Sequence, residues 1–453
     1  MSEATKTLTC GEAGWHLSRY LVFTPINEQK SYAAMNLYQG SFTVLNQAEA
    51  YLLSIAEELD EDHPVLEKLK KFGLIVNFDE RAALFATGRL NSFRNSSVCL
   101  TICPTMGCNF DCPYCFENHR AGRMDQETQD AVVSLAEKML DCSGIRNLYI
   151  NWFGGEPLLV PDIIEHLTVR LRKLAEARDG HYNAKIVTNG YLLTAENIAL
   201  LARCGIERAQ VTLDGLGEMH DRTRCLAGGG ATFETITKNL RENKIPFVVD
   251  IRHNVYEDNL EERQRLKDYV DKLARESGNS LHYYANLVAG SRVMEEKGNP
   301  VEKLADQAGI MDVGLKLEAE RYGSKPGIHC MANCLVSVAI DDQGRLHKCL
   351  ENVDKAEESF GDVRRWDIRD PFRTADDPDL LTHFLNTCCP SPAPECVDCL
   401  WLPMCCGGCP RRRLNNENVC FSFKDDPQAF ALAVYKALGE KSLHQKKAPE
   451  PRC

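Results

Sequence analysis

The chain has 453 residues, a formal net charge of −12 and a composition of 44% hydrophobic and 26% charged residues. That length predicts two or three domains of an ordinary soluble protein, and the negative charge argues against a general nucleic-acid binder. Because no apolar run reaches the roughly 18 to 20 residues that cross a bilayer, and residues 1–15 lack a signal-peptide pattern, we expect a cytoplasmic protein without a membrane partner.

Residues 1–96 predict a small winged-helix-like module. Strands are expected at 19–25 and within 33–45, where a Gln39-Gly40 turn divides the segment, and a short strand is expected at 74–76. Apolar residues at helical spacing predict helices at 48–59 and 64–72. The module has two readings: a structural cap, or a docking site where a peptide adds a strand to an open sheet edge.

Residues 97–315 alternate between expected strands and expected helices. The strands are at 98–103, 148–153, 184–187, 209–213, 247–252 and 281–287, and the helices between them are at 125–140, 161–177, 194–203, 232–242 and 260–277. This alternation predicts an α/β fold with a parallel sheet and right-handed crossovers. Six strands are too few for a closed eight-stranded barrel, so we expect a partial (βα)6 barrel with its site at the carboxyl ends of the strands.

Residues 316–453 are rich in cysteine and loops, and the tail from about residue 439 is polar and expected to be loose. The whole chain has 21 cysteines. In a long cytosolic chain, clustered cysteines bind metal more often than they form disulfides. We therefore expect metal ligation to stabilise a C-terminal cysteine-rich domain that lacks a strong apolar core.

Three cysteines directly follow the first strand of the expected barrel. Cys108, Cys112 and Cys115 have the spacing C-x3-C-x2-C on one short loop. Three thiolates that hold a four-iron cluster leave one iron with an open position, whereas structural zinc sites usually have four protein ligands. His119 follows too loosely to complete a zinc set. Iron–sulfur ligation is the favoured reading, with zinc second.

With this motif after its first strand, the segment Val98 to Leu287 resembles the radical S-adenosylmethionine (SAM) superfamily. The resemblance implies that the open iron binds the amino and carboxylate groups of S-adenosylmethionine. It also implies that electron transfer yields a 5′-deoxyadenosyl radical, which abstracts hydrogen from a substrate. The protein then positions and shields chemistry that its cofactors supply.

The same resemblance implies further cofactor-binding residues at the strand ends. The turn after the second strand matches the methionine-binding motif, Arg252 is placed to pair with the methionine carboxylate, and two residues are placed near adenine. The full set is Tyr114, Gly154, Gly155, Glu156, Pro157, Asn189, Thr212, Asp214, Arg252 and Leu287. Taken singly, these residues also fit ordinary turns, a surface ion pair and core packing.

The C-terminal cysteines resemble the SPASM extension of radical SAM enzymes. The pattern is Gly344-x4-Cys349 after Cys334, and later C-x2-C-x5-C-x3-C followed by one more cysteine. The resemblance implies two auxiliary four-iron clusters, the first held by Cys330, Cys334, Cys349 and Cys409, the second by Cys396, Cys399, Cys405 and Cys420. Without Cys330 as a ligand, the first auxiliary cluster would keep an open iron. The alternative is a pair of zinc sites.

These resemblances together predict a peptide maturase, because SPASM enzymes largely modify peptides and proteins. We expect a ribosomally made peptide with a leader sequence as substrate and a thioether or carbon–carbon crosslink as product. The expected cofactors are S-adenosylmethionine and three [4Fe-4S] clusters, with a reductant such as flavodoxin or ferredoxin.

Two alternatives stay open. The first is anaerobic sulfatase maturation, which oxidises Cys or Ser to formylglycine. Those enzymes commonly have an acidic residue directly after the cysteine of the Gly-x4-Cys motif, where this chain has Leu350. The second alternative, from another class, is a non-catalytic zinc-binding interaction protein.

Overall fold

A computed structural model describes residues 14–26, 30–60, 62–93, 96–256, 259–287, 330–386, 393–415, 417, 419–420 and 423–438. The expected boundary at residues 315/316 and the tail from residue 439 lie outside these ranges. The described residues form two compact units, one made of residues 14–91 with 393–438, the other of residues 92–287 with 330–386. This grouping differs from the three-part division expected from the sequence, because the two parts of the C-terminal region belong to different units.

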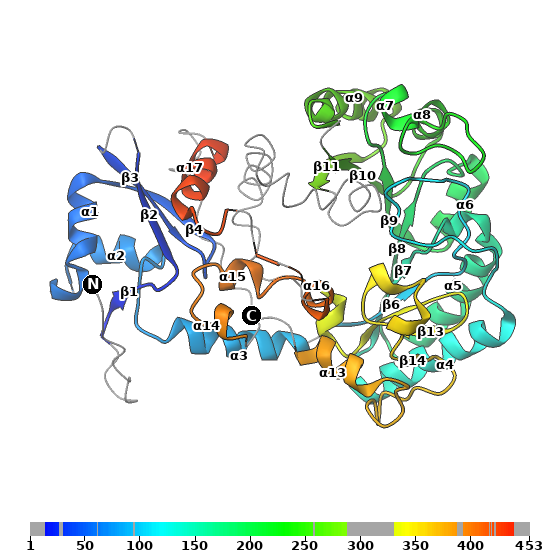
Figure 1. Ribbon diagram of the computed structural model, residues 1–453, viewed down its shortest axis with the longest axis horizontal. Helices are drawn as coiled ribbons and strands as arrows, with labels where there is room; N and C mark the ends of the chain where they lie inside the picture. The colour runs from blue at the N-terminus through cyan, green and yellow to red at the C-terminus, as the bar shows by residue number, and fades with distance from the viewer. Residues whose placement is uncertain are drawn as a thin grey trace. The chain divides into compact units, whose positions relative to one another are not determined.

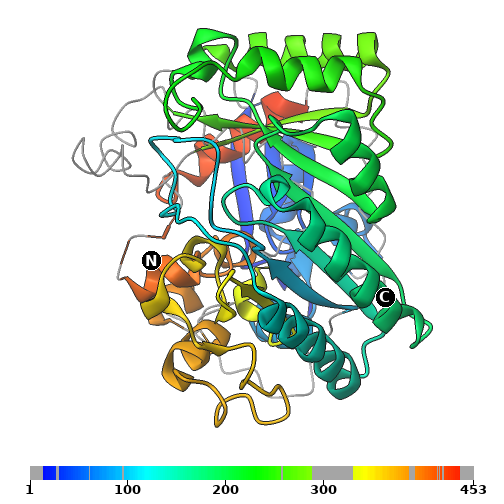
Figure 2. The same ribbon diagram turned by 90° about the vertical axis from the view of Figure 1, so that its right-hand side faces the viewer.

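The second unit contains a nine-stranded sheet with the order β11-β10-β9-β8-β7-β6-β12-β13-β14. Its first six strands are parallel and follow chain order, which confirms the expected α/β fold with a parallel sheet. They are β6 (Ser97–Ile102), β7 (Asn147–Trp152), β8 (Tyr182–Thr188), β9 (Ile206–Thr212), β10 (Val248–Val255) and β11 (Leu281–Leu287). Figure 2 shows these strands side by side in a twisted sheet.

Helices connect these parallel strands. They are α4 (Gln126–Ser143), α5 (Pro161–Glu176), α6 (Ala195–Arg203), α7 (Glu218–Asp221), α8 (Phe233–Glu242) and α9 (Glu262–Ser277), with a short 3-10 helix, η2 (Pro157–Leu159). Local capping fixes where α4 starts and stops. Asp125 accepts from the backbone N–H of Thr128 at the start of α4, which ends at Gly144 with a φ of 68°.

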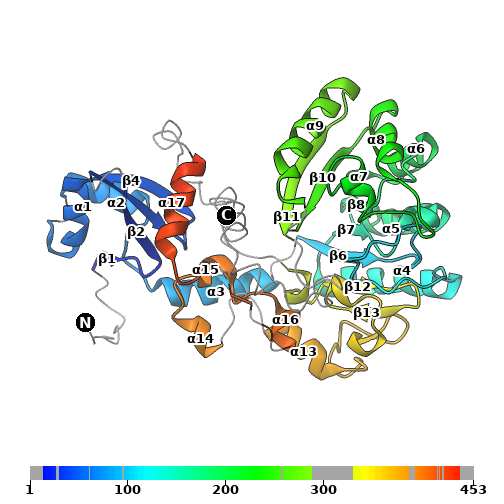
Figure 3. The ribbon, with the colours of Figure 1, turned by 45° about the horizontal axis from the view of Figure 1, so that its top comes forward.

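The sheet has one apolar face and one polar face. Alternate residues such as Leu100, Ile150 and Ile186 are fully buried against the helices, which lie on one side of the sheet (Figure 3). The residues between them, such as Tyr149 and Lys185, are half-buried and point to the opposite face. We call this opposite side the inner face.

The sheet continues into the C-terminal region, for which the sequence predicted many loops and no strand. Strand β12 pairs in parallel with β6, and β13 and β14 follow in antiparallel pairs. The elements are β12 (Ser337–Ile340), β13 (Arg345–His347), β14 (Gly361–Asp362), η4 (Met331–Asn333), η5 (Leu350–Asn352), η6 (Ala356–Glu358) and α13 (Pro378–Asn386). Four residues are too few to show strand periodicity, so the sequence did not reveal β12.

The first unit contains a three-stranded antiparallel sheet, β2-β3-β4, and a separate β1-β5 pair. The strands are β1 (His16–Leu17), β2 (Leu21–Ile26), β3 (Ser31–Asn36), β4 (Ser41–Asn46) and β5 (Ile75–Val76). The helices are α1 (Gln47–Ser54), η1 (Ala56–Glu58), α2 (Pro64–Lys71), α3 (Glu80–Phe93), α14 (Pro394–Val397), α15 (Leu402–Cys405), α16 (Pro410–Leu414) and α17 (Pro427–Leu438). The winged-helix-like classification of the N-terminal part stays a prediction.

Both faces of this small sheet are covered. Leu45 packs with residues of α1 and α2 on one face. On the other face, Val22 and Met35 share a core with Trp401 and Phe430, and Figure 1 shows α17 against β2 and β3. The N-terminal sheet is therefore completed by residues from the far end of the chain.

None of the helices that the structure describes is both long and apolar enough to span a membrane.

Glu80 is a buried carboxylate of α3 that joins this helix to the segment before β2 through hydrogen bonds. It is 2% exposed and accepts from the Ser18 hydroxyl and the Arg19 backbone N–H, each at 2.9 Å. Glu80→Ala leaves these buried donors without their acceptor, so we expect a loss of about 3 kcal/mol in the free energy of unfolding. Urea unfolding followed by tryptophan fluorescence measures it. Glu57→Ala, on an exposed residue, is the control, and equal effects of the two would contradict this role.

Candidate functional site

The three cysteines of the C-x3-C-x2-C motif lie on the loop that follows β6, and their side chains are half-buried. Their sulfur atoms are close enough that Cys112 and Cys108 both act on the charge of Cys115. Burial raises the pKa of Cys108 and of Cys115 to about 12 and also raises that of Cys112. Thiols with such pKa values ligate only when a positively charged metal group stabilises the thiolates. An all-sulfur donor set of this kind fits an iron–sulfur cluster.

The glycine turn after β7 packs directly against this cysteine loop. The Gly155 N–H donates to the Thr105 carbonyl at 3.2 Å, and the Glu156 N–H donates to the Gly107 carbonyl at 2.8 Å. A Cβ atom on Gly155 would lie 2.2 Å from the Gly107 oxygen. The absence of a side chain at Gly155 therefore leaves room for the backbone of the neighbouring loop. Pro157 then begins η2.

Glu156 joins the carboxyl ends of β7 and β8. Its side chain is fully buried and accepts from the Thr188 hydroxyl at 2.8 Å, the Asn189 N–H at 2.7 Å and the Leu158 N–H at 3.0 Å. Asn189 in turn donates its amide to the Asn109 side chain at 2.8 Å, within the cysteine loop. Burial raises the pKa of Glu156, and these donors oppose the shift. Glu156 therefore fixes the positions of the strand ends that surround the loop.

A second segment, residues 224–227, holds the cysteine loop from another side. The Asp111 N–H donates to the Cys225 carbonyl at 3.0 Å, and the Ala227 N–H donates to the Asn109 carbonyl at 2.8 Å. Sequence analysis missed this segment because nothing in its pattern shows that it pairs with a loop more than one hundred residues earlier in the chain.

Arg224 places a buried positive charge beside the loop. It is 9% exposed, donates to the Tyr114 hydroxyl at 2.7 Å and lies 5.6 Å from the centroid of the Phe110 ring. The Tyr114 hydroxyl also donates to the Asp214 carboxylate. Burial raises the pKa of Asp214, and Arg224 is the largest opposing influence. The positive charge of Arg224 thus offsets the negative charge of the buried Asp214 carboxylate and would offset that of a Cys112 thiolate.

Four of the predicted cofactor-binding residues meet at the carboxyl ends of β9 and β10. Thr212 and Arg252 are register partners in the sheet. Asn254 donates its backbone N–H to Asp214 and its side-chain amide to Tyr114, each at 3.2 Å, while Arg252 donates to the Asn254 side chain at 2.7 Å. Leu287 ends β11, one strand further along. The structure thus gathers Tyr114, Thr212, Asp214 and Arg252 beside the cysteine loop.

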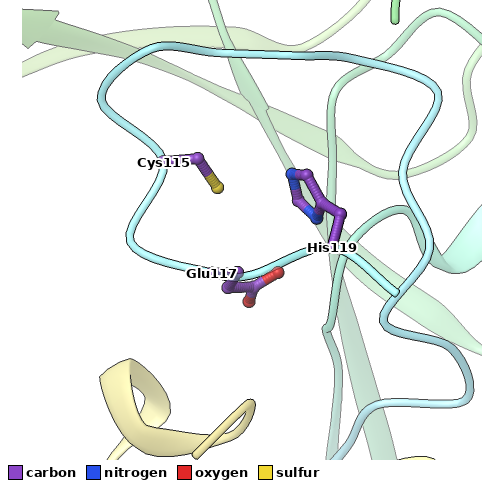
Figure 4. A group of neighbouring side chains, drawn as sticks. All are labelled: Cys115, Glu117 and His119. Carbon is purple, nitrogen blue, oxygen red and sulfur yellow. The ribbon is translucent and has the colours of Figure 1, made fainter. Parts of the chain in front are cut away.

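A carboxylate and an imidazole lie next to Cys115, although the sequence spacing argued against His119 as a metal ligand. Potential ligand atoms of Cys115, Glu117 and His119 all lie within 4.8 Å of one another (Figure 4). Burial, and then Asp354, raise the pKa of Glu117 to about 8. Such a mixed donor set suits zinc, so the geometry supplies a zinc alternative that shares only Cys115 with the three-cysteine site.

The C-terminal cysteines are divided between the two units. Cys330, Cys334 and Cys349 belong to the unit with the large sheet, where Cys330 and Cys334 flank η4 and Cys349 precedes η5. Cys409, the fourth member of the expected first auxiliary set, belongs to the other unit. The structure does not bring these four into one unit.

The four cysteines of the expected second auxiliary set all lie in the first unit. Burial raises the pKa of Cys405 to about 11, and Cys399 and Cys396 are near enough to add to the shift. Arg413 contacts the sulfur of Cys396 at 2.9 Å, and Lys424 contacts that of Cys420 at 3.8 Å. Cations that donate to sulfur favour thiolates, which is the state that metal ligation needs.

The core of the larger unit is similar to proteins that are already known. The model of the Radical SAM superfamily matches residues 102–270. The chain is 26% identical over 191 residues to the sporulation killing factor maturation protein SkfB of Bacillus subtilis, covering 42% of each chain. It is 29% identical over 197 residues to the AdoMet-dependent heme synthase of Methanosarcina barkeri, covering 42% of this chain and 50% of that protein.

A third relative is the PqqA peptide cyclase of Gluconobacter oxydans, 27% identical over 159 residues, with 33% of this chain and 41% of that protein covered. The matched region thus spans half or less of these relatives' length. The solved structure of native anSMEcpe with bound AdoMet and Cp18Cys peptide has a TM-score of 0.53 at 19% identity, covering 77% of this chain and 99% of that one. At this identity the structural likeness concerns the fold.

Metal analysis of single variants distinguishes the two sites that share Cys115. If the three cysteines hold a cluster, Cys108→Ala and Cys112→Ala lower iron and sulfide in anaerobically purified protein, and His119→Ala does not. If zinc occupies the mixed site, His119→Ala and Glu117→Gln remove zinc, and Cys108→Ala has no effect. Cys115→Ala affects either metal. Zinc that depends on His119, in iron-free protein, would contradict the cluster reading.

Proposed function

We propose that this chain is a radical SAM peptide maturase, because residues 102–270 match the model of the Radical SAM superfamily. It would abstract a hydrogen atom from a ribosomally made peptide and install a thioether or a carbon–carbon crosslink. The observation that carries this proposal is the cysteine loop at the carboxyl ends of a parallel sheet. Two other segments hold this loop through backbone hydrogen bonds, and the chain also contains a separate small sheet.

When bound, the cluster and S-adenosylmethionine supply one-electron cleavage of the cofactor and removal of a substrate hydrogen atom. Cys108, Cys112 and Cys115 would hold the cluster, and the Arg252 guanidinium would pair with the methionine carboxylate. Arg224 and Asp214 keep Tyr114 in place at the edge of the loop. The protein's part is therefore to position and enclose the cofactors.

The remaining cofactor and partner assignments are also proposals. The two auxiliary clusters would be held by the C-terminal cysteines, of which the set at Cys396, Cys399, Cys405 and Cys420 has the stronger support, because cations contact two of its sulfur atoms. Such clusters would accept the electron that remains when a substrate radical closes a bond. A small electron carrier such as flavodoxin or ferredoxin would reduce the enzyme.

Cofactor cleavage tests the central assignment. We expect the variant with Cys108, Cys112 and Cys115 all changed to Ala to form no more 5′-deoxyadenosine from S-adenosylmethionine under dithionite than a protein-free mixture does. Cys142→Ala, on an exposed cysteine of α4, should leave the yield unchanged. Chromatography of the quenched reaction measures the product, and undiminished product from the triple variant would refute the site.

The β4 strand of the small sheet has the edge that best suits a leader peptide. Lys68 donates to the Val44 carbonyl at 3.2 Å, so the backbone polar groups of Val44 point away from β3. By the same alternation Pro25, which lacks an N–H, faces the outer edge of β2, and α17 packs near that strand. A peptide would therefore add to β4, next to the Lys68 ammonium.

Removing one edge donor tests this docking. Val44→Pro deletes the N–H at the proposed interface, and we expect a drop in affinity for a labelled leader peptide of roughly three- to tenfold, the worth of one hydrogen bond. Val44→Ala retains the N–H and should bind within twofold of the unmodified protein, as measured by fluorescence anisotropy. Equal affinities of the two variants would contradict docking at β4. Truncation is a poorer test, because it would also uncover Trp401 and Phe430.

A further inference from the structure

The inner face of the large sheet carries polar residues that nothing in the proposed cofactor site uses. Lys185 on β8 lies beside Asn151 on β7 and beside Arg208 on β9, so that three polar side chains are neighbours across three strands. Most other polar groups on this face are mutually satisfied. The Tyr284 hydroxyl, for example, donates to Gln210 at 2.7 Å.

Lys185 is an exception to that pattern. Its side chain is half-buried, and within the described part of the chain no acceptor receives a hydrogen bond from its ammonium, which lies 5.7 Å from the centroid of the Tyr149 ring. Burial lowers the pKa of Lys185, and Cys99 and Asp250 oppose that shift only in part. An ammonium without a counterion in such a place is destabilising by itself, which points to an anionic ligand.

Asn151, the register partner of Lys185, is an independent second exception. It is 6% exposed and donates its amide to the Thr101 hydroxyl at 3.3 Å, but its own Oδ1 atom is buried and accepts from no donor in the described residues. Folded proteins rarely leave such an atom unsatisfied. An unsatisfied acceptor therefore lies beside an unpaired cation on the same face.

We propose that Lys185 and Asn151 bind a carboxylate that has a peptide N–H beside it, as in an Asp or Glu residue or at a peptide C-terminus. The ammonium would pair with the carboxylate while the Asn151 Oδ1 atom accepts from the N–H. This inference rests on the proposed peptide substrate and names the feature of it that the inner face recognises.

The local charge count favours one carboxylate over a polyphosphate. Arg208 is already paired with Asp250 through two hydrogen bonds, at 2.8 and 2.6 Å, so Lys185 is the single uncompensated cation of this group. The Asp250 carboxylate would also repel a ligand with several negative charges. Lys185 lies three residues before Thr188, or roughly 10 Å from the carboxyl end of β8 at 3.3 Å per residue. The carboxylate would therefore be held at a distance from the reacting position.

Fragment binding to the anaerobically purified full chain tests the site without turnover. The probes are acetyl-Glu-methylamide and acetyl-Gln-methylamide for a side chain, and acetyl-Ala and acetyl-Ala-methylamide for a C-terminus, each titrated by ligand-observed NMR. We expect one carboxylate probe to bind and its amide counterpart to bind at least tenfold more weakly. Which of the two carboxylates binds distinguishes their source.

Variants then assign that binding to the two residues. Lys185→Met should weaken the carboxylate probe roughly ten- to a hundredfold, Asn151→Leu should weaken it less, and Lys185→Arg should keep it within about threefold. Lys238→Met, on an exposed lysine of α8, is the control. Lys185→Met should not lower the thermal unfolding midpoint, because it removes a half-buried charge that lacks a hydrogen-bond acceptor among the described residues, so lost binding is distinguishable from lost folding.

Three results would overturn the proposal. They are unchanged binding in Lys185→Met, equal binding of acid and amide probes, and displacement of the carboxylate probe by a polyphosphate, for which GTP is the test compound, at lower concentration than by the probe itself. Each result leaves cofactor cleavage intact. Conversely, a chain that binds the probe at Lys185 but produces no 5′-deoxyadenosine would contradict the proposed function and not this site.

Discussion

Everything proposed for the site depends on the backbone hydrogen bonds that hold the loop of residues 105–115 against two neighbouring segments. The turn after β7 donates two backbone hydrogen bonds to it, and the segment 224–227 exchanges two more with it from another side. These bonds fix the loop backbone through protein contacts alone, so the positions of the three thiols are constrained before any metal binds. Such preorganisation lowers the entropic cost of ligation.

Side chains alternate along the parallel strands, so the residues of the core and the residues of the proposed binding site lie on opposite faces of the sheet. One set of alternate residues packs against the helices and forms the core, and the other set lines the inner face, where Asn151 lies one residue from the end of β7 and Lys185 lies three residues from the end of β8. Because both sets belong to the same strands, the core that holds the sheet together also fixes the spacing of the polar groups. Substitutions on the two faces should therefore have different consequences, the first for folding and the second for binding.

The sequence predicted what depends on local patterns. The alternation of expected strands with expected helices revealed all six parallel strands, and the close spacing of Cys108, Cys112 and Cys115 placed them on one loop. It did not reveal features that arise from tertiary contacts. The burial of Arg224 depends on the loop that folds over it, and His119 returns to Cys115 through a loop conformation that spacing does not encode. The sequence did not show that the close neighbour of Gly155 is Gly107.

The shared core of β2, β3 and the C-terminal helix has a consequence for synthesis of the chain. Val22 and Met35 leave the ribosome long before Trp401 and Phe430, which cover them in the finished protein. At 5 to 20 residues per second the delay is on the order of tens of seconds. One face of the N-terminal sheet stays uncovered for that time, so nascent chains are expected to bind chaperones. A chain that ended before Trp401 would also leave Val22 and Met35 uncovered.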